Sequence, residues 1–375
     1  MQGLYLHIPF CEQKCKYCDF LSYPGRQNAN KERYIDALLR EMTLRIKGRW
    51  EKPDTIFIGG GTPTALSNDE LAQILKRLND LVDLSHVKEF TCEANPGTVD
   101  EEKLQLLKSG GVNRISFGVQ SFDTLLLQRI GRIHTSQAAI EVVQLAKKIG
   151  FNNINVDLMY GLPGQTRAQW IDTIRTALSL ETQHISLYQL ILEPYTAIVK
   201  ELEKGLLPPI DEDGAAEWFD AQREWLAKGG YTQYEISNYA LHGFASMHNQ
   251  LYWELDDYLG LGVGATSWER TVRRVNTSNF SEYVNTRSDA NTLLYNEEKL
   301  SIKDQMSESV FMALRMNRGL SRKKFVQLYE QDVTDVFQAA IQEGMKKQWL
   351  SLTEDALYLT DSGRSVGNWV FELFI

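Results

Sequence analysis

The sequence predicts an α/β fold, in which strands that alternate with helices pair in parallel. Three observations predict this class. Short apolar segments of strand length recur through the first half of the chain, and longer amphipathic segments separate them. The composition, with 43% AVILMFWYC and 24% charged residues, is typical of a soluble globular protein. Strands and helices that alternate in this way are joined by right-handed crossovers and pair in parallel. They form either a full or partial (β/α) barrel or an open doubly wound sheet, and the pattern alone does not distinguish the two.

The elements of the first half follow one another in a regular order. Strands are expected at Leu4–Ile8, Thr55–Ile58, Glu89–Glu93, Arg114–Phe117, Ile154–Leu158 and Ile185–Leu190. Helices are expected between them at Asn30–Lys47, Asn68–Leu84, Glu101–Lys108, Ser136–Gly150 and Arg167–Leu180. Two helix starts carry cap-type residues, because Ser67 precedes Asn68 and Thr135 precedes Ser136.

The second half changes in character after a charged stretch that contains two prolines, Glu203–Asp213. A long helix is expected at Glu212–Gly229, followed by a mixed region rich in Tyr and Gly to about residue 275. From Lys299 the pattern predicts three short helices and then two strands, Trp349–Leu352 and Ala356–Thr360, an order typical of a winged helix. The expected regions are therefore residues 1–205, 206–298 and 299–375.

Charge and hydropathy exclude several classes of partner. The 375 residues carry 40 Lys+Arg against 49 Asp+Glu, a net charge of -9, which argues against nucleic acid as a partner. Residues 301–375 hold nine basic and ten acidic side chains, so we expect the tail to be structural or to dock a protein. No apolar run reaches the ~18 residues of an integral membrane span, and the start lacks the basic region of a signal peptide. The expected location is cytoplasmic.

Three of the four cysteines lie within eight residues, in the pattern CxxxCxxC. Cys11, Cys15 and Cys18 follow the first strand, so they occupy the sheet edge where sites form in α/β folds. Zinc sites usually combine two short ligand pairs, and the sequence has no second pair. Three thiolates on one loop suit a cubane iron–sulfur cluster with one open iron. Lys14 and Lys16 indicate an exposed loop, which argues against cysteines buried as small hydrophobes.

Cys92 offers an alternative fourth ligand. Adjacent residues of a strand face opposite sides, so Cys92 and Glu93 cannot both point to the site. We expect Glu93 to face the site and Cys92 to pack against helices.

Further polar residues follow successive strands at the same edge. Gly60, Gly61 and Thr62 lie after the second strand, where glycine lets the backbone approach a ligand. Glu93, Gln120 and Asp157 mark the ends of the next three strands. A single residue of this kind is usually a helix cap or a solvated rim, but three that converge on one edge predict a binding site.

Several segments of the sequence resemble those of a known family. The CxxxCxYC loop after the first strand is similar to that of the radical S-adenosylmethionine (SAM) superfamily. The segments YLHIPFC, GGGTPT, EANPG, GVQSFD, IGRIH and NVDLMYGLPGQT resemble the branch that contains oxygen-independent coproporphyrinogen III oxidases and a family of haem chaperones. The resemblance covers nearly the whole chain.

The resemblance implies a fold, two cofactors and a set of site residues. The fold is a partial (β/α)6 barrel followed by a smaller α+β region with a winged-helix-like tail. The cofactors are a [4Fe–4S] cluster on Cys11, Cys15 and Cys18, and SAM, which the reduced cluster cleaves. The implied SAM-binding residues are Tyr5, Tyr17, Gly60, Gly61, Thr62, Glu93, Gln120, Arg132 and Asp157.

Two departures separate this chain from the oxidases of the branch. Phe20 stands where the oxidases carry a fourth cysteine, and Tyr5 lies so near the start that their N-terminal extension is expected to be absent. His248 opens an HNxxYW segment that resembles a motif of the haem chaperones. Because imidazole is a frequent axial ligand of haem, His248 is the expected haem-binding residue. The alternative is a hydrogen-bonded histidine that packs beside aromatic side chains.

The leading hypothesis is a radical-SAM-type haem chaperone that passes haem to an acceptor protein. Its expected partners are haem, that acceptor and an electron donor for the cluster. The alternative is a radical SAM enzyme of porphyrin biosynthesis that decarboxylates coproporphyrinogen III, and a third hypothesis is a SAM-binding redox protein without porphyrin.

Overall fold

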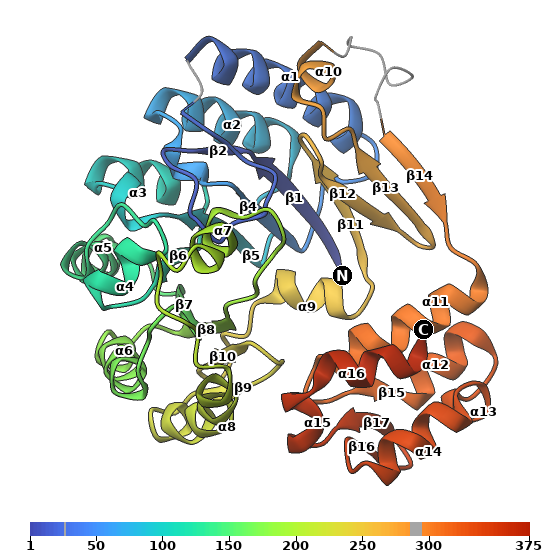
Figure 1. Cartoon of the computed structure of the whole chain (residues 1–375). Coiled ribbons are helices and arrows are strands. Elements are labelled where there is room, and N and C mark those ends of the chain that lie inside the picture. The colour runs from blue at the N-terminus through green and yellow to red at the C-terminus, as the bar shows by residue number, and fades with distance from the viewer. Residues whose placement is uncertain (26–27, 286–294) are drawn as a thin grey trace.

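Six parallel strands form the centre of the molecule, in the same order as in the sequence (Figure 1). The computed structural model describes residues 1–25, 28–285 and 295–375. The strands are β1 (Gln2–Ile8), β4 (Thr55–Gly60), β5 (Glu89–Ala94), β6 (Arg114–Gln120), β7 (Ile154–Tyr160) and β8 (His184–Gln189). Each expected strand is therefore confirmed, with ends that differ by at most three residues.

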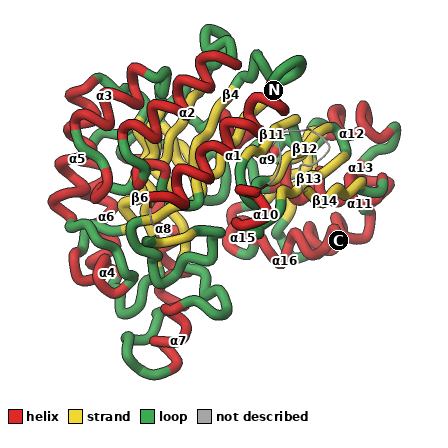
Figure 2. Tube along the Cα trace, turned by 90° about the horizontal axis from the view of Figure 1, so that it is seen from above, coloured by secondary structure: helices red, strands yellow, loops and turns green. Residues whose placement is uncertain are grey.

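Helices cover the outer face of these strands, as the view from above in Figure 2 shows. They are α1 (Asn28–Ile46), α2 (Asn68–Leu81), α3 (Glu101–Ser109), α4 (Thr124–Arg129), α5 (Ser136–Ile149) and α6 (Arg167–Ser179), with short 3-10 turns η1 (Pro63–Ala65) and η2 (Pro96–Thr98). Helix α2 begins with the expected cap: the Ser67 hydroxyl accepts the amide of Glu70, whose carboxylate accepts the amide of Ser67.

The strand order is that of a partial barrel. Strand β1 pairs with β4 and with β11 (Asp257–Leu261), whereas β8 pairs with β7 and with β10 (Asn238–Ala240). The first and last of the six strands therefore do not pair with each other, and the barrel stays open between them. Because the order never reverses, the alternative of a doubly wound sheet is excluded.

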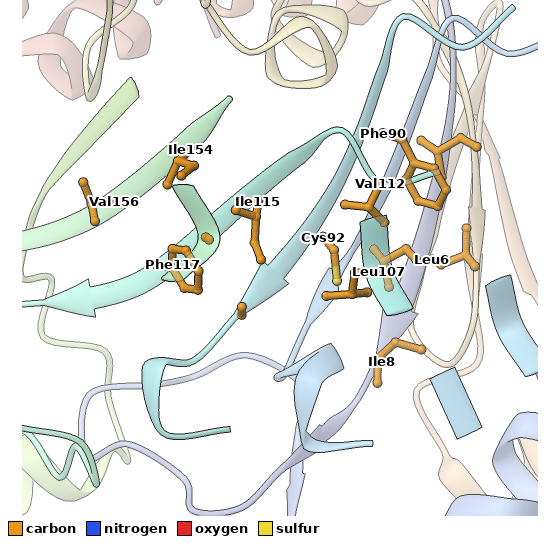
Figure 3. Packing of buried hydrophobic residues seen from close by; sticks show 14 of the residues in the cluster. Leu6, Ile8, Phe90, Cys92, Leu107, Val112, Ile115, Phe117, Ile154 and Val156 are labelled. Atoms are coloured by element: carbon orange, nitrogen blue, oxygen red, sulfur yellow. The ribbon is translucent and has the colours of Figure 1, made fainter. Parts of the chain in front are cut away.

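Alternation along β5 separates the core from the barrel interior. Phe90 and Cys92 point outward and are fully buried under the helices, where Cys92 lies close to Leu107 of α3 (Figure 3). Glu89 and Glu93 therefore lie on the opposite, inner face of the strand. The expectation that Cys92 packs against helices is confirmed, and Glu93 lies on the inner face of the strand, as expected of a residue that faces the site.

A region of mixed structure widens this sheet on both sides. Besides β10 and β11, its elements are α7 (Ala197–Glu203), α8 (Glu212–Lys228), β9 (Thr232–Gln233), α9 (Met247–Trp253), β12 (Thr266–Glu269), β13 (Val272–Asn276), α10 (Phe280–Asn285) and β14 (Tyr295–Lys299). Near the N-terminus, β2 (Phe10–Cys11) and β3 (Tyr23–Pro24) pair with each other in a separate sheet. Strand β10 runs antiparallel to β8, and β11 runs parallel to β1. Helix α9 joins these two strands, so the chain crosses the open side of the barrel there.

The tail packs around its own core of Val310, Phe325 and Leu357 and lies to one side of the barrel (Figures 1 and 2). It comprises α11 (Ile302–Leu314), β15 (Leu320–Ser321), α12 (Arg322–Tyr329), α13 (Val333–Val336), α14 (Gln338–Lys346), β16 (Leu350–Leu352), β17 (Ala356–Leu359), α15 (Asp361–Ser365), α16 (Gly367–Phe371) and η4 (Glu372–Phe374). Four helices precede the two expected strands instead of three, and β15 adds a third strand to them. Within the described ranges, no helix has both the length and the apolar character that crossing a bilayer requires.

Candidate functional site

The cysteine loop lies at the carboxyl ends of β1 and β4. Hydrogen bonds tie it to the glycine-rich turn, because the amide of Gly61 donates to the Ile8 carbonyl oxygen (2.8 Å) and the amide of Thr62 to that of Phe10 (2.7 Å). Cys11, Cys15 and Cys18 are all half-buried. The turn and the three thiols, which the sequence places 40 residues or more apart, are therefore neighbours.

Each of the three sulfur atoms has a hydrogen-bond donor beside it. The Thr62 hydroxyl lies 3.7 Å from Cys11 Sγ, and Arg132 Nη1 lies 3.3 Å from Cys15 Sγ. The main chain of Phe20 hydrogen-bonds to the Cys18 thiol. Donors to ligating sulfurs stabilise thiolates and tune iron–sulfur clusters.

The cysteine donor set fits a cluster. Burial raises the pKa of Cys11 and raises the pKa of Cys18 to about 11, so ligation has to displace their protons. Among the residues described, no three His, Cys, Asp or Glu side chains surround a single point as ligands of one metal ion would. Three cysteines, each with its own donor, suit a cubane in which every thiolate has its own iron.

Close packing explains the glycines of the turn. Gly60 has a φ of +110°, and a Cβ atom there would lie 2.5 Å from the ring of His7. A Cβ atom on Gly61 would lie 2.7 Å from the Phe10 carbonyl oxygen. The amide of Gly60 donates to Glu93 Oε2 (3.0 Å), so this turn and the end of β5 hold each other.

Two carboxylates point into the barrel interior from β5 and β7. Glu93 and Asp157 are both half-buried. Burial and then the charge of Asp157 raise the pKa of Glu93 to about 8. Burial also raises the pKa of Asp157, although Asn155 Nδ2 (2.8 Å) and the Ser116 hydroxyl (3.1 Å) donate to it. The Gly60 amide thus holds Glu93, and both oxygens of Asp157 accept hydrogen bonds from side chains of β6 and β7.

Tyr5 lies on the inner face of β1, next to His7. Nε2 of His7 lies 3.0 Å from the Leu21 carbonyl oxygen and must carry the proton, since a carbonyl only accepts. Nδ1 therefore accepts the hydrogen bond from the Tyr5 hydroxyl, 3.0 Å away. This pair fixes the Tyr5 ring at the same edge as the glycine turn.

Arg132 connects the cysteine loop to the end of β6. Its guanidinium donates to the Gly118 carbonyl as well as to Cys15. Gln120 follows with a φ of +69° at a break in the β6–β7 register, so its side chain lies beside Gly118. Arg132 Nε is buried and has no hydrogen-bond partner within the described part of the chain. An unpaired donor of a guanidinium fits a ligand carboxylate.

Tyr17 lies on the other side of Cys15. Its ring packs against a small apolar cluster that includes Leu126 and Ile130, and its hydroxyl hydrogen-bonds to Cys15. Burial raises the pKa of Tyr17, so the hydroxyl remains protonated. This position suits a side chain that covers the cysteine loop and limits the access of water to it.

Helix α9, which carries the HNxxYW segment, lies at the opposite end of the barrel. The ring of His248 is fully buried, with Nδ1 2.7 Å from the Thr55 hydroxyl and Nε2 2.8 Å from the Tyr252 hydroxyl. Burial and the charge of Arg114 lower the pKa of His248 to about 3. Both ring nitrogens are therefore engaged with hydroxyl groups, and haem binding by His248 stays a prediction.

Residues at the strand starts hold α9 in place. Glu89 accepts from the amides of Met247 (2.8 Å) and His248 (3.0 Å) and from the Ser246 hydroxyl (3.2 Å). Glu89 and Thr55 are the first residues of β5 and β4, and neither was an expected site residue. Their only signal in the sequence is a polar side chain at the start of an apolar strand.

Comparisons with known proteins agree with this geometry. The model of the Radical SAM superfamily matches residues 5–177, and that of the HemN C-terminal domain matches residues 300–366. The heme chaperone HemW of Bacillus subtilis (strain 168) is 38% identical over 100% of this chain and 99% of its own length. The heme chaperone HemW of Escherichia coli (strain K12) is 35% identical over 100% and 98%.

The fold has a solved counterpart. Coproporphyrinogen III oxidase (HemN) from Escherichia coli superposes with a TM-score of 0.86 and 23% identity, over 100% of this chain and 89% of that one. At this identity the likeness shows the fold alone. The full-length identity to the chaperones, together with the superfamily match over the barrel, shows that the chain belongs to the radical SAM superfamily and, within it, to the family of the heme chaperone HemW.

Proposed function

We propose that this chain binds a [4Fe–4S] cluster and SAM at the cysteine edge of the barrel, binds haem, and passes the haem to an acceptor protein. The observation that carries the first part is the cysteine loop itself: three half-buried thiols with a donor at each sulfur. When bound, the cluster and SAM supply one-electron chemistry. Cys11, Cys15 and Cys18 would hold the cluster.

The groups around the loop match the parts of SAM. The unpaired Nε of Arg132 is a partner for its carboxylate. The backbone of Gly60 and Gly61 lets the methionine part approach closely. Asp157 is the proposed acceptor for ribose hydroxyls, because its half-buried carboxylate faces the barrel interior.

Glu93, Gln120, Tyr5 and Thr62 complete the proposed SAM site. Glu93 and Gln120 offer hydrogen-bonding groups at neighbouring strand ends, and Thr62 donates to Cys11. Tyr17 would exclude water from the cluster.

A chaperone is preferred to the oxidase on two grounds. The chain is 35–38% identical over its full length to proteins named as heme chaperones and 23% identical to the oxidase. Phe20, at the place of the oxidases' fourth cysteine, is 66% exposed and offers no ligand.

The proposal includes the remaining partners and the compartment. An electron donor would approach at the cysteine loop, where Lys14 and Phe20 are exposed. The tail, with its near-neutral charge, is the proposed docking unit for a protein. Unpaired thiols stay reduced and available as ligands in a reducing compartment, which supports a cytoplasmic location.

Anaerobic reconstitution tests the proposal. We expect about four irons and four acid-labile sulfides per chain, and a Soret band when haem is added. Haem should then move to an apo-haemoprotein added as acceptor, and coproporphyrinogen III should not be decarboxylated. Zinc without sulfide, or efficient decarboxylation, would contradict the chaperone proposal.

A further inference from the structure

A layer of buried polar side chains crosses the barrel interior next to Asp157. Ser116, Asn155 and His184 lie on the neighbouring strands β6, β7 and β8, where the register pairs Ser116 with Asn155 and Asn155 with His184. Their neighbours in sequence, such as Ile185, belong to the outer core, so these polar side chains point inward. All three are buried, and His184 is fully so. The layer therefore lies inside the barrel, two residues before Asp157 on β7.

Asn155 uses every hydrogen-bonding position of its amide. Nδ2 donates to Asp157 Oδ1 (2.8 Å) and to the Ser116 hydroxyl (2.8 Å), which in turn donates to Asp157 Oδ2 (3.1 Å). Oδ1 accepts from His184 Nδ1 (2.6 Å) and from the Ser186 hydroxyl (3.2 Å). An amide that is occupied on both sides cannot turn over without losing these bonds. The two donors at Oδ1 therefore fix the side of Asn155 that holds Asp157.

The hydrogen bonds of His184 determine where its proton lies. Nδ1 must carry the proton, because Oδ1 of Asn155 only accepts. Burial and the charge of Arg114 keep the pKa of His184 well below its usual value, so the ring is neutral and has this one proton. Nε2 therefore accepts the hydrogen bond from the Tyr234 hydroxyl, 2.9 Å away. His184 is thus a donor on the side of Asp157 and an acceptor on the other side.

Tyr234 connects this layer to the start of α9. Its hydroxyl oxygen accepts the amide of Ser246, 3.2 Å away. Ser246 is the N-cap residue of α9, where its own hydroxyl accepts the amide of Asn249. A continuous hydrogen-bond network, the Asp157–Ser246 network, therefore runs through Asp157, Asn155, His184, Tyr234 and Ser246.

We propose that His184 is a positioning residue that couples the proposed SAM site to the start of α9; this inference rests on the proposed SAM binding. On one side, Nδ1–H of His184 orients Asn155 and, through it, Asp157. On the other side, Nε2 holds Tyr234 and, through it, the N-cap of α9. A carboxylate binds ribose hydroxyls well only when its own supports are fixed. SAM at Asp157 and an ordered α9 thus favour the same arrangement of hydrogen bonds, which is the condition for coupling between two places in a protein.

Substitutions at His184 test the side that faces Asp157. His184→Leu should raise the dissociation constant for SAM about tenfold, because Asn155 loses one of the two donors at Oδ1. His184→Asn keeps a donor at the place of Nδ1 and should restore most of the affinity. Anaerobic equilibrium dialysis of the cluster-reconstituted full chain measures both values. A dissociation constant in His184→Leu equal to that of the wild type, or no recovery in His184→Asn, would overturn the positioning role.

Hydrogen exchange read by mass spectrometry tests the side that faces α9. In the wild type, SAM should slow the exchange of backbone amides in residues 246–253 at least about fivefold. Tyr234→Phe loses the hydroxyl that joins His184 to Ser246, and His184→Asn loses the nitrogen that accepts from Tyr234. Both variants should bind SAM but lose this protection. They decide the question even if His184→Leu does not fold, and protection equal to that of the wild type in both would overturn the coupling.

Tyr231→Phe is the matched control. The Tyr231 hydroxyl donates to the Thr182 carbonyl near the start of β8, outside the Asp157–Ser246 network. Its loss should leave both the dissociation constant for SAM and the protection of α9 as in the wild type. A wild-type chain that binds no SAM would refute the proposed function and the coupling with it. A wild-type chain that binds SAM without any protection of α9 would refute the coupling alone.

Discussion

Glu89 and Glu93 lie on the same face of strand β5, four residues apart, and hold opposite ends of the barrel. Glu93 accepts from the amide of Gly60 at the cysteine edge, and Glu89 accepts from the amides of Met247 and His248 at the start of α9. At about 3.3 Å per residue, the two carboxylates are separated by ~13 Å along the strand. One strand therefore connects the proposed SAM site with the helix of the proposed haem site.

Glu89→Ala should loosen α9. The substitution leaves three buried donors at the start of the helix without their acceptor, and we expect the free energy of unfolding to fall by about 3–5 kcal/mol. Urea unfolding followed by tryptophan fluorescence measures this change. Glu102→Ala, on the exposed face of α3, is the control and should stay within about 0.5 kcal/mol of wild type. Equal stability of the two variants would show that Glu89 does not anchor α9.

Cys92 should play no part in metal binding. Its thiol is fully buried in the outer core, and burial raises its pKa above the usual range. Cys92→Ala should keep the iron and sulfide content of the reconstituted chain and lower stability by about 1–2 kcal/mol. Cys11→Ala should instead lose most of the iron, because three thiolates are the minimum for the proposed cluster. Iron loss in Cys92→Ala would point to a fourth cysteine ligand.

Arg132→Lys should weaken SAM binding. Lysine keeps the positive charge but loses the planar fork that reaches Gly118, Cys15 and a ligand carboxylate together. We expect the dissociation constant for SAM to rise about 10- to 100-fold, measured by anaerobic equilibrium dialysis. Arg129→Lys is the control on neighbouring α4, where the guanidinium donates to the Pro163 carbonyl. Equal affinity in the two variants would remove Arg132 from the site.

The sequence predicts the cysteine edge far better than the α9 end. Strand alternation is local, so Cys92 and Glu93 could be assigned to opposite faces from the pattern alone. The contact of His248 with Thr55 joins residues 193 positions apart, and no periodic pattern reports such a contact. From the sequence, His248 resembles a metal ligand because it belongs to a motif. In the structure, its surroundings are those of a buried residue whose two ring nitrogens are hydrogen-bonded. The pairing of β11 with β1 was missed for the same reason, because a parallel pair needs no turn that a sequence would reveal.

Stability should fall as the pH rises from 6 to 8, and Glu93 should be a main cause. Its carboxyl has a pKa of about 8 in the folded chain, raised by burial and by Asp157, against about 4.3 when unfolded. Between these values the folded state binds more protons than the unfolded state, so the free energy of unfolding decreases with pH.

The variant Glu93→Gln tests this cause, because it keeps an acceptor for the Gly60 amide and cannot ionise. In the absence of SAM, the free energy of unfolding of the wild type should fall by about 1–2 kcal/mol more than that of Glu93→Gln between pH 6 and pH 8. This value is reduced to account for the partial exposure of Glu93 to solvent. Urea unfolding at pH 6, 7 and 8 measures the difference, with exposed Glu101→Gln as control. Parallel curves for wild type and Glu93→Gln would mean that Glu93 is already ionised at pH 6 in the folded chain.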